Sequence, residues 1–419
     1  MKNKIIIVLI IGILIRLILA SITLHPDIIM FHLSGQIVGS GNLMNIYDYI
    51  GRLPASDPLT RIFPPDLYIY PPAVYVFFGY VSNTLSSIIP ASIHNSLTYN
   101  LHEVLGNWQL NILLLLFKAA YLPFDIGIAF LLTKFFTDRK NKFIAFMLWM
   151  FNPVVIYATY MMAQFDIIPT FFTILALYLV SFRKNLSDLK KLYLGAFVLG
   201  IGASFKIFPL LFVIPLALLG KSLKTRIITV AIGFVTYFIT LVPFLSSPGF
   251  RTSALVAGQT LKSFYAQIPI SGGESILLYP TFLIFFYLIL YFRNGELNTL
   301  WHRFFIVLTI FFIFTHYHPQ WFLWITPFLI LDIVKTNLKH WLPAALAVLS
   351  FTALLFFFEP SLTIGMFSPI SPNLYDTVSI WKILGLNPNI NFSRSIFQTM
   401  FVGVAVYYIY YYFPNKSRN

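Results

Sequence analysis

The sequence predicts an all-α protein in which the whole chain, residues 1–419, forms one bundle of membrane-spanning helices. Of these residues, 58% are hydrophobic and only 10% are charged, whereas a soluble globular domain carries about 25% charged residues. The mean hydropathy is +0.80. Apolar segments recur along the chain, and many approach the roughly 20 residues that a helix needs to cross a bilayer. These three observations exclude an ordinary soluble fold.

The first apolar segment, residues 5–21, follows a short basic start and lacks a clear small-residue cleavage site. We therefore interpret it as a retained first span that begins in the cytoplasm. The further apolar segments are 109–134, 143–159, 168–182, 192–205, 207–219, 226–245, 276–292, 304–315, 320–334, 341–357 and 395–413. Although several of them are short for a span, we expect about twelve spans in all.

The segment 69–82 tests this topology because it is apolar but short. At about 1.5 Å per residue it reaches only about 21 Å, against a hydrocarbon core of roughly 30 Å, so we expect it to be interfacial or re-entrant. If it crossed the membrane, the basic stretches 139–142 and 221–226 would face outward, against the positive-inside rule. Both termini are therefore expected in the cytoplasm of a protein of the cytoplasmic membrane.

Three long external segments follow from this topology: 22–108, 246–275 and 358–394. Connections of this length are usually functional or folded, so we expect interfacial helices in the first and the chemistry on the outer face. The net charge of +14, from 28 Lys and Arg against 14 Asp and Glu, falls mainly on the cytoplasmic loops. It therefore indicates orientation rather than nucleic-acid binding. The absence of cysteine excludes disulfides and thiolate metal sites.

Two short motifs place carboxylates on the outer face. His25 and Asp27, separated by a proline, follow the first span, and Asp27 is either a base fixed at a helix end or a solvated loop acid. Gln164 and Asp166 lie in an outer turn, where polar residues commonly form a solvated cap. If Asp166 faces the same cavity as Asp27, the two acids would suit sugar hydroxyls or a divalent cation.

Lys206 is an ionisable residue within the membrane thickness, because the apolar stretches on either side of it are short and Pro209 prevents the helix from continuing smoothly from one to the other. Such residues are costly and are functional candidates by default, here for binding a lipid phosphate near the outer headgroups. The alternative is that its amine snorkels to the interface. Arg251, on the second external segment, either contacts an anionic headgroup or is solvated.

A tight outer turn between two short apolar segments holds His316, His318 and Gln320, whose polar groups suggest the wall of a pocket. Two histidines at positions i and i+2 do not share a helical face, so they are a weak metal signal. Within the spans, we expect Arg16 and Asp125 to form an interhelical ion pair with a structural role.

These motifs, in this order, resemble the GT-C superfamily of multi-spanning glycosyltransferases, and in particular its GPI-mannosyltransferase-related and bacterial polyprenol-phosphate-mannose-dependent branch. The resemblance extends over roughly residues 20–330 and implies a GT-C bundle with a long first external loop. It is carried by His25-Pro26-Asp27, Tyr70-Pro71-Pro72, LFKAAYLPFD ending at Asp125, Phe151-Asn152-Pro153, Gln164-Phe165-Asp166, Phe205-Lys206 with Pro209, and the run from His318 to Trp324.

The resemblance implies an inverting transfer of a hexose, with mannose as the expected sugar, from a polyprenyl-phosphate donor. The acceptor would be a hydroxyl of a glycan, glycolipid or protein on the extracytoplasmic face. Asp27 takes the part of the general base, and Lys206 that of the basic residue near the donor phosphate, with Arg251 and His318 as further phosphate candidates. The candidates for binding sugar and acceptor are His25, Gln164, Asp166 and Gln320.

The sequence indicates no certain cofactor, although Asp27 and Asp166 leave room for a divalent cation, Mg²⁺ or Mn²⁺. Membrane lipid and the lipid-linked donor are the expected partners, and nucleic acid is not. Two other functions stay open. A transporter or flippase for lipid-linked glycans would show inverted internal repeats, which we do not find in the sequence. A glycan polymerase or ligase would use an oligosaccharide diphosphate lipid in place of a monosaccharide monophosphate lipid.

Overall fold

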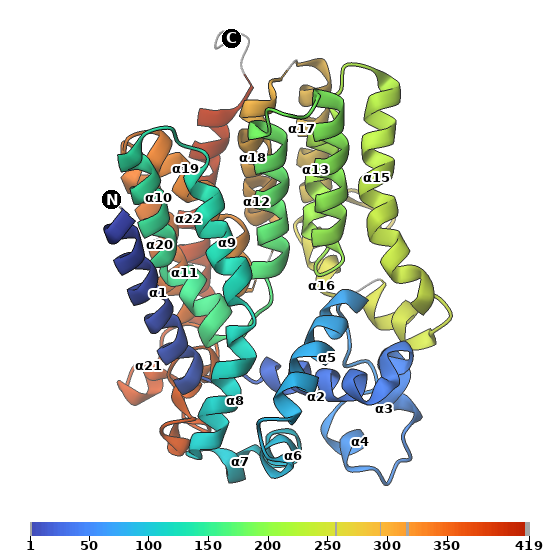
Figure 1. Ribbon diagram of the computed structural model, residues 1–419, viewed down its shortest axis with the longest axis vertical. Helices are drawn as coiled ribbons and strands as arrows, with labels where there is room; N and C mark the ends of the chain where they lie inside the picture. Colours follow the sequence, from blue (N-terminus) through green and yellow to red (C-terminus); the bar gives the residue numbers. More distant parts are fainter. Residues whose placement is uncertain (1, 256–257, 294, 316–317, 415–419) are drawn as a thin grey trace.

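The computed structural model describes residues 2–255, 258–293, 295–315 and 318–414, and its regular structure is almost entirely helical. A bundle contains α1 (Lys2–Ile22), α8 (Trp108–Ala119), α9 (Leu122–Thr133), α10 (Arg139–Met150), α11 (Pro153–Val155), α12 (Ile167–Phe182), α13 (Asp188–Ala203), α14 (Val213–Ala217), α15 (Leu223–Leu241), α17 (Leu278–Phe292), α18 (Leu300–Phe314), α19 (Thr326–Lys335), α20 (Trp341–Leu355) and α22 (Ile390–Tyr412). A cap contains α2 (Asp27–Ile37), α3 (Tyr49–Arg52), α4 (Pro58–Ile62), α5 (Pro72–Ser86), α6 (Ala91–Tyr99) and α7 (Leu101–Val104). The all-α prediction is confirmed, and Figure 1 shows the cap below the bundle.

Membrane-spanning helices are fewer than the sequence suggested. Within the described residues, four helices are long and apolar enough to cross a membrane: Asn3–Ile22, Arg139–Met161, Leu223–Phe244 and Leu297–Phe314. Helices α8 and α9 meet at a bend of 42° and form a fifth span if they are counted together. The expectation of about twelve spans is therefore wrong, but several long apolar helices still suggest a multi-pass membrane protein.

The other apolar segments do form helices, but most of these are too short or too interrupted to qualify as spans. Helix α12 has 16 residues and α17 and α20 have 15 each. At about 1.5 Å per residue they reach about 24 Å or less, short of a roughly 30 Å hydrocarbon core. The segment 207–219 is divided between a 3₁₀ helix (Phe208–Phe212) and α14. Counting apolar residues missed these breaks in the helical backbone.

The cap is built from the segment 22–108, which the sequence predicted to carry interfacial helices. Helix α5 covers most of the segment 69–82 and is not among the candidate spans. It packs against α2, and Gly35 permits the close approach, because a Cβ at this position would lie 2.0 Å from the hydroxyl oxygen of Ser82. The cap is therefore a folded layer held to itself by tight helix packing.

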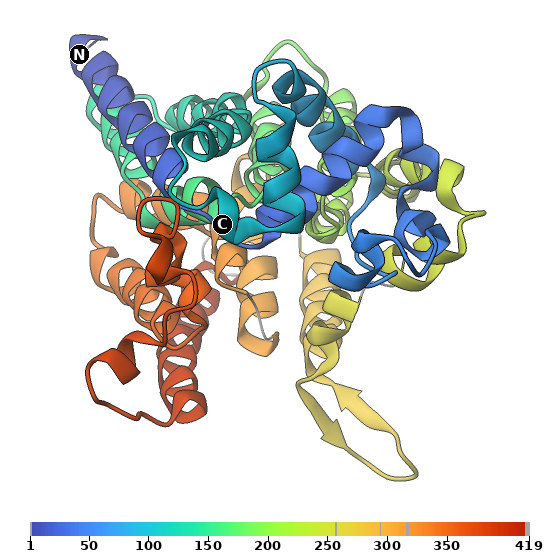
Figure 2. The ribbon, with the colours of Figure 1, turned by 90° about the horizontal axis from the view of Figure 1, so that it is seen from below.

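The segment 246–275 forms more structure than the loop that we predicted. It contains the short helix α16 (Gly258–Leu261) and leads into an antiparallel hairpin of β1 (Gln267–Pro269) and β2 (Ser275–Leu277), with Ile268 opposite Ile276. Gly272 and Gly273 take φ values of +60° and +89° in the connecting turn, a region that glycine enters without steric cost. Figure 2 shows the hairpin, in yellow, projecting away from the bundle.

The two ends of the bundle differ in their connections. Helices α9 and α10 are joined, and α12 and α13 are joined, at the end far from the cap, where α15 also begins (Figure 1). These connections contain or border the basic stretches 139–142 and 183–191. The segment 358–394, which includes α21 (Ile380–Ile383), lies instead at the end that carries the cap (Figure 1). The long predicted external segments thus occur away from the basic connections.

A buried ion pair ties α1 to α9 inside the bundle. The Nε of Arg16 lies 2.5 Å from a carboxylate oxygen of Asp125, and both side chains are fully buried. Asp125 also accepts hydrogen bonds from Trp149 Nε1 at 2.7 Å and from the Tyr160 hydroxyl at 2.7 Å. The interhelical pairing of Arg16 with Asp125 is therefore confirmed.

Candidate functional site

Polar and aromatic side chains gather where the cap meets the bundle. Asp27 is the first residue of α2, Gln164 and Asp166 lie in the turn before α12, and Lys206 follows α13. A 3₁₀ helix, Pro319–Trp324, contributes tryptophans. We call the group that these contacts define the junction site: Asp27, Tyr70, Gln164, Phe165, Asp166, Lys206, Trp321 and Trp324.

The turn before α12 has a backbone that its surroundings hold in place. Ala163 has a φ of +60°, in the left-handed region that costs a residue with a Cβ roughly 1–2 kcal/mol. Its carbonyl oxygen accepts a hydrogen bond from the Tyr121 hydroxyl at 2.8 Å. The backbone N–H of Gln164 donates to the Ala158 carbonyl at 3.0 Å. Such strained residues cluster at functional sites because a fixed geometry is needed there.

Asp166 is fully buried and its carboxylate is fully engaged. Lys206 Nζ donates to both carboxylate oxygens, at 2.8 and 3.0 Å, and Trp324 Nε1 donates to Oδ1 at 2.5 Å. The Lys206 side chain is only 11% exposed. Asp166 is therefore not the solvated cap residue that was one alternative, and Lys206 does not snorkel away from the protein.

Aromatic rings surround the Lys206 ammonium on several sides. Its Nζ lies between 5.3 and 5.9 Å from the ring centroids of Tyr70, Phe165, Trp321 and Trp324. A cation at such distances is attracted by the electron-rich ring faces, each by roughly 0.5–2 kcal/mol. The ammonium is thus stabilised by one carboxylate and by aromatic faces, in a largely buried site.

Asp27 is the accessible carboxylate of the junction site. Its side chain is 39% exposed, and its Oδ2 accepts a hydrogen bond from Gln164 Nε2 at 2.8 Å. His25 Nδ1 lies 3.7 Å from the same oxygen. Burial lowers the pKa of His25, an effect that Asp27 and Glu359 oppose. Gln164 is fully buried, and its Oε1 has no hydrogen-bond partner among the described residues.

Tyr70 lies close enough to Asp27 and Asp166 for both negative charges to act on its phenol. Its pKa is raised well above 10, first by burial and then by the negative charges of Asp27 and Asp166. The phenol therefore keeps its proton and is a hydrogen-bond donor near both carboxylates. Its backbone is fixed from the cap, because the Tyr70 amide donates to the Tyr75 hydroxyl at 3.0 Å and its carbonyl accepts from the Tyr47 hydroxyl at 2.6 Å.

Residues 318–324, which follow α18 in the chain, reach the junction site through Trp321 and Trp324. The ring of His318 lies 5.5 Å from that of Trp321, and its Nε2 is 2.7 Å from Lys262 Nζ. Gln320 is buried, and its Oε1 has no hydrogen-bond partner in the described part of the chain. His316, the other histidine of this motif, lies outside the described residues.

The structure brings most, but not all, of the predicted site residues together. Arg251 is exposed and donates to the carbonyl oxygen of Leu245, and its contacts do not connect it with the junction site. Trp324 was not among the predicted site residues, yet its indole N–H donates to the Asp166 carboxylate. Lys262, which lies on the same external segment as Arg251, contacts His318. A buried indole N–H requires a hydrogen-bond acceptor. This requirement is the one feature of the sequence that could have indicated a polar contact of Trp324.

A divalent cation does not fit this arrangement. No group of three or more His, Cys, Asp or Glu residues is placed to hold a metal ion anywhere in the described ranges. The Asp166 carboxylate already accepts hydrogen bonds from Lys206 and Trp324, so Asp27 would have to bind the ion without it. Magnesium prefers near-octahedral oxygen coordination, which one accessible carboxylate does not supply.

Comparison of the chain with protein-family models, with curated proteins and with solved structures finds no match.

Proposed function

We propose that this chain is a membrane glycosyltransferase that moves a hexose, with mannose as the expected sugar, from a polyprenyl-phosphate donor to an acceptor hydroxyl, with inversion. The observation that carries the proposal is the pairing of Asp27, an accessible carboxylate, with the buried Gln164. This pair adjoins a buried site that contains Asp166 and Lys206. Its sequence motifs resemble those of glycosyltransferases of the GT-C type.

Asp27 is the general base in this proposal. Gln164 occupies one carboxylate oxygen, which leaves the other to accept the proton of an acceptor hydroxyl. The acceptor oxygen forms a bond to the anomeric carbon on the face opposite the donor phosphate. As that bond forms, the bond from the anomeric carbon to the phosphate oxygen breaks, and its electron pair stays on the phosphate. Such proton transfer in the transition state contributes typically 10²–10⁴-fold in rate.

Lys206 and the Lys262–His318 pair are the groups proposed for the leaving phosphate. The Lys206 charge is already balanced by Asp166, so this pair presents a dipole rather than a free cation. Lys262 Nζ lies 2.7 Å from His318 Nε2, which makes this pair the second candidate for the phosphate. Arg251, an earlier phosphate candidate, has no comparable support. The orphan Oε1 atoms of Gln164 and Gln320 suit the hydroxyl groups of a sugar.

The proposed location is the cytoplasmic membrane, with both chain termini in the cytoplasm and the junction site on the extracytoplasmic face. The separation of the basic connections from the cap supports this orientation, because basic loops are retained in the cytoplasm. The acceptor would be a glycan, a glycolipid or a protein that approaches from outside. Its lipid-linked donor would approach from the outer leaflet.

The test is a transfer assay on the protein reconstituted in vesicles with radiolabelled polyprenyl-phosphate mannose and a panel of glycan, glycolipid and peptide acceptors. We expect Asp27→Asn to lower transfer by at least about 100-fold. The matched control is Asp66→Asn, because Asp66 is an exposed acid of the same cap segment. If both variants keep full activity while remaining folded, Asp27 is not the base.

The same vesicles separate the alternatives. A flippase would change the side on which the lipid-linked sugar is found without breaking the sugar–phosphate bond. A polymerase or ligase would be inactive with the monosaccharide monophosphate donor and active with an oligosaccharide diphosphate lipid. Either result would replace the proposed transferase.

A further inference from the structure

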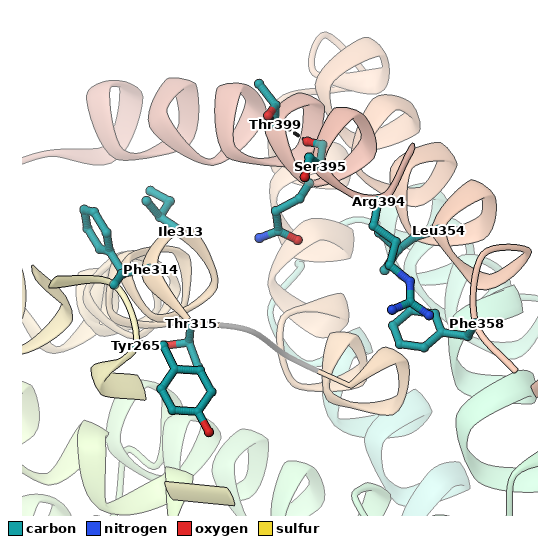
Figure 3. A pocket seen from close by; sticks show the side chains of 11 residues that line it. Tyr265, Ile313, Phe314, Thr315, Leu354, Phe358, Arg394, Ser395 and Thr399 are labelled. Carbon is teal, nitrogen blue, oxygen red and sulfur yellow. Dashed lines mark hydrogen bonds between the residues drawn. The ribbon is translucent and has the colours of Figure 1, made fainter. Parts of the chain in front are cut away.

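A cavity of about 480 Å³ lies away from the junction site, on the side of the bundle where the hairpin and α22 project (Figure 2). Its walls come from four places in the chain: the residues before β1, the end of α18, the end of α20 with the turn after it, and the first turns of α22. Figure 3 shows these side chains around the cavity. Neither the sequence motifs nor the proposed transfer reaction uses them.

Arg394 provides the positive charge of this cavity. Its Nε donates to the Phe357 carbonyl at 2.8 Å, and its guanidinium lies 4.2 Å from the ring centroid of Phe358. These two contacts hold the group in place. The charge of Glu359 acts on it, but among the described residues the guanidinium forms no ion pair with a carboxylate, so its terminal nitrogens can still meet an anion. A fixed guanidinium is suited to binding two oxygens of one phosphate.

A second donor in the cavity lacks a partner. Thr315 is 2% exposed, and its hydroxyl has no hydrogen-bond partner in the described ranges. The hydroxyls of Ser395 and Thr399 already donate to carbonyl oxygens within α22. Gln398 donates to the Phe312 carbonyl at 3.1 Å, and Tyr265 is 64% exposed. Thr315 and the terminal nitrogens of Arg394 are thus the buried or fixed donors that face the cavity without such a partner. An unpaired buried hydroxyl and a guanidinium without an ion pair, on different walls of one cavity, point to a ligand that accepts hydrogen bonds and carries negative charge.

The rest of the cavity and its surroundings are apolar. Phe314 and Leu354 line it, and the neighbouring hairpin exposes Ile268 and Ile270 by 52% and 61%. Phe392, two residues before Arg394, is 64% exposed. Exposed apolar side chains on both sides of a cavity favour a ligand with hydrocarbon chains, because burying them removes apolar surface from water.

We propose that this cavity binds the phosphodiester end of an anionic lipid, with Arg394 on the phosphate oxygens, Thr315 donating to an ester or phosphate oxygen, and the chains against Phe314 and Leu354. One guanidinium matches the single charge of a phosphodiester better than the higher charge of a phosphate monoester. A glycerophospholipid and a lipid-linked sugar share this chemistry. The inference does not depend on the proposed transfer reaction, because no residue of the junction site takes part.

Two probes test the site on the full-length protein in a neutral detergent: dihexanoyl phosphatidylglycerol, which is anionic, and dihexanoyl phosphatidylcholine, which is zwitterionic. Binding is measured by native mass spectrometry. We expect the anionic lipid to bind at least about tenfold more tightly than the zwitterionic one. Arg394→Gln should remove this preference, and Thr315→Val should weaken binding of the anionic lipid severalfold at nearly constant side-chain volume. Arg61→Gln, which changes an exposed arginine of α4, should leave binding unchanged.

Equal binding of the two lipids by the natural protein would overturn the proposal, as would an unchanged preference in Arg394→Gln. If Arg394→Gln does not fold, Thr315→Val and Arg394→Lys carry the test, since the lysine keeps the charge but loses the paired donors. A third probe, a short isoprenyl phosphate ester of mannose, distinguishes the sources. Tighter binding of this probe than of phosphatidylglycerol identifies a lipid-linked sugar, and the reverse identifies a membrane phospholipid. If the natural protein transfers sugar but does not prefer the anionic lipid, this site is excluded and the proposed transfer reaction is unaffected.

Discussion

Gln164 donates a hydrogen bond from its Nε2 to the Asp27 carboxylate over 2.8 Å, although 137 residues separate the two in the chain. The contact joins the cap to the bundle, because Asp27 begins α2 and Gln164 precedes α12. It leaves the Gln164 Oε1 buried without a partner among the described residues. Gln164 therefore orients the carboxylate and retains an acceptor for a ligand.

Replacing Gln164 with leucine should remove the donor while nearly preserving volume. We expect transfer to fall roughly 10- to 100-fold, since a hydrogen bond to a charged group is worth roughly 1.5–3 kcal/mol. The loss should be no larger than that of Asp27→Asn. Initial rates in the vesicle assay measure it, with thermal melting as the check on folding. Activity equal to the natural protein would mean that Gln164 does not position Asp27.

The Asp166–Lys206 pair allows a test that separates stability from chemistry. Asp166→Asn and Lys206→Met each leave one buried charge unpaired, so each should destabilise the protein by about 3–5 kcal/mol. The double variant should recover much of that loss, because neither charge remains. Chemical unfolding in detergent measures the stabilities.

Transfer by the double variant then decides the part that Lys206 plays. If Lys206 helps to hold the donor phosphate, the double variant should be stable and yet transfer at least about tenfold more slowly. A stable double variant with normal transfer would make the pair purely structural. Lys262→Met is the companion experiment, since Lys262 contacts His318 rather than Asp166.

The sequence predicted the class of the fold and one buried contact well. Composition and apolar segments indicated helices and a membrane, and α1 lies where the first span was expected. The pairing of Arg16 with Asp125 followed from the cost of isolated charges in an apolar bundle. The number of spans did not follow, because the 3₁₀ turn near Phe208 and the early ends of α12, α17 and α20 are not visible as changes in hydrophobicity.

The candidate site was predicted as a set of residue types but not as contacts. Lys206 and Asp166 were both identified, but their pairing depends on how the end of α13 packs beside the turn before α12. The local sequence carries no information on how close these two segments lie. Trp324 was missed as a site residue because tryptophan at the end of an apolar segment is commonly a membrane-interface residue. Tertiary packing decided between these two uses of the same side chain.

The Arg16–Asp125 pair should stabilise the fold far more than a surface pair. Arg16→Met leaves the Asp125 carboxylate buried with only Trp149 and Tyr160 as donors, so we expect a loss of about 3–5 kcal/mol. The control is Asp188→Asn, which breaks the ion pair between Asp188 and Lys191 at the protein surface and should cost less than about 1 kcal/mol. Unfolding in detergent gives both values, and similar losses in the two variants would contradict the prediction.

Stability should also fall at mildly acidic pH because of a histidine pair in the cap. His32 Nε2 lies 3.0 Å from His94 Nδ1, and the rings are stacked with centroids 4.9 Å apart. Burial, with a smaller effect of His94, lowers the pKa of His32 to about 3. The folded protein keeps His32 neutral, whereas the unfolded chain protonates it below about pH 6.5. This contribution to stability is therefore full above that pH and is lost as the pH falls toward 3.

Between pH 6.5 and pH 4.5 this linkage should cost roughly 2–3 kcal/mol, at about 1.4 kcal/mol for each pH unit. His32→Leu should be less stable than the natural protein at pH 7.5, since His94 loses its partner, but its stability should fall less on acidification. His102→Gln is the control, because His102 is exposed and should leave the pH dependence unchanged. Comparing the variants also removes the contribution of His25, whose pKa burial lowers in the same direction. The same acid-induced loss in His32→Leu as in the natural protein would assign the effect to other groups.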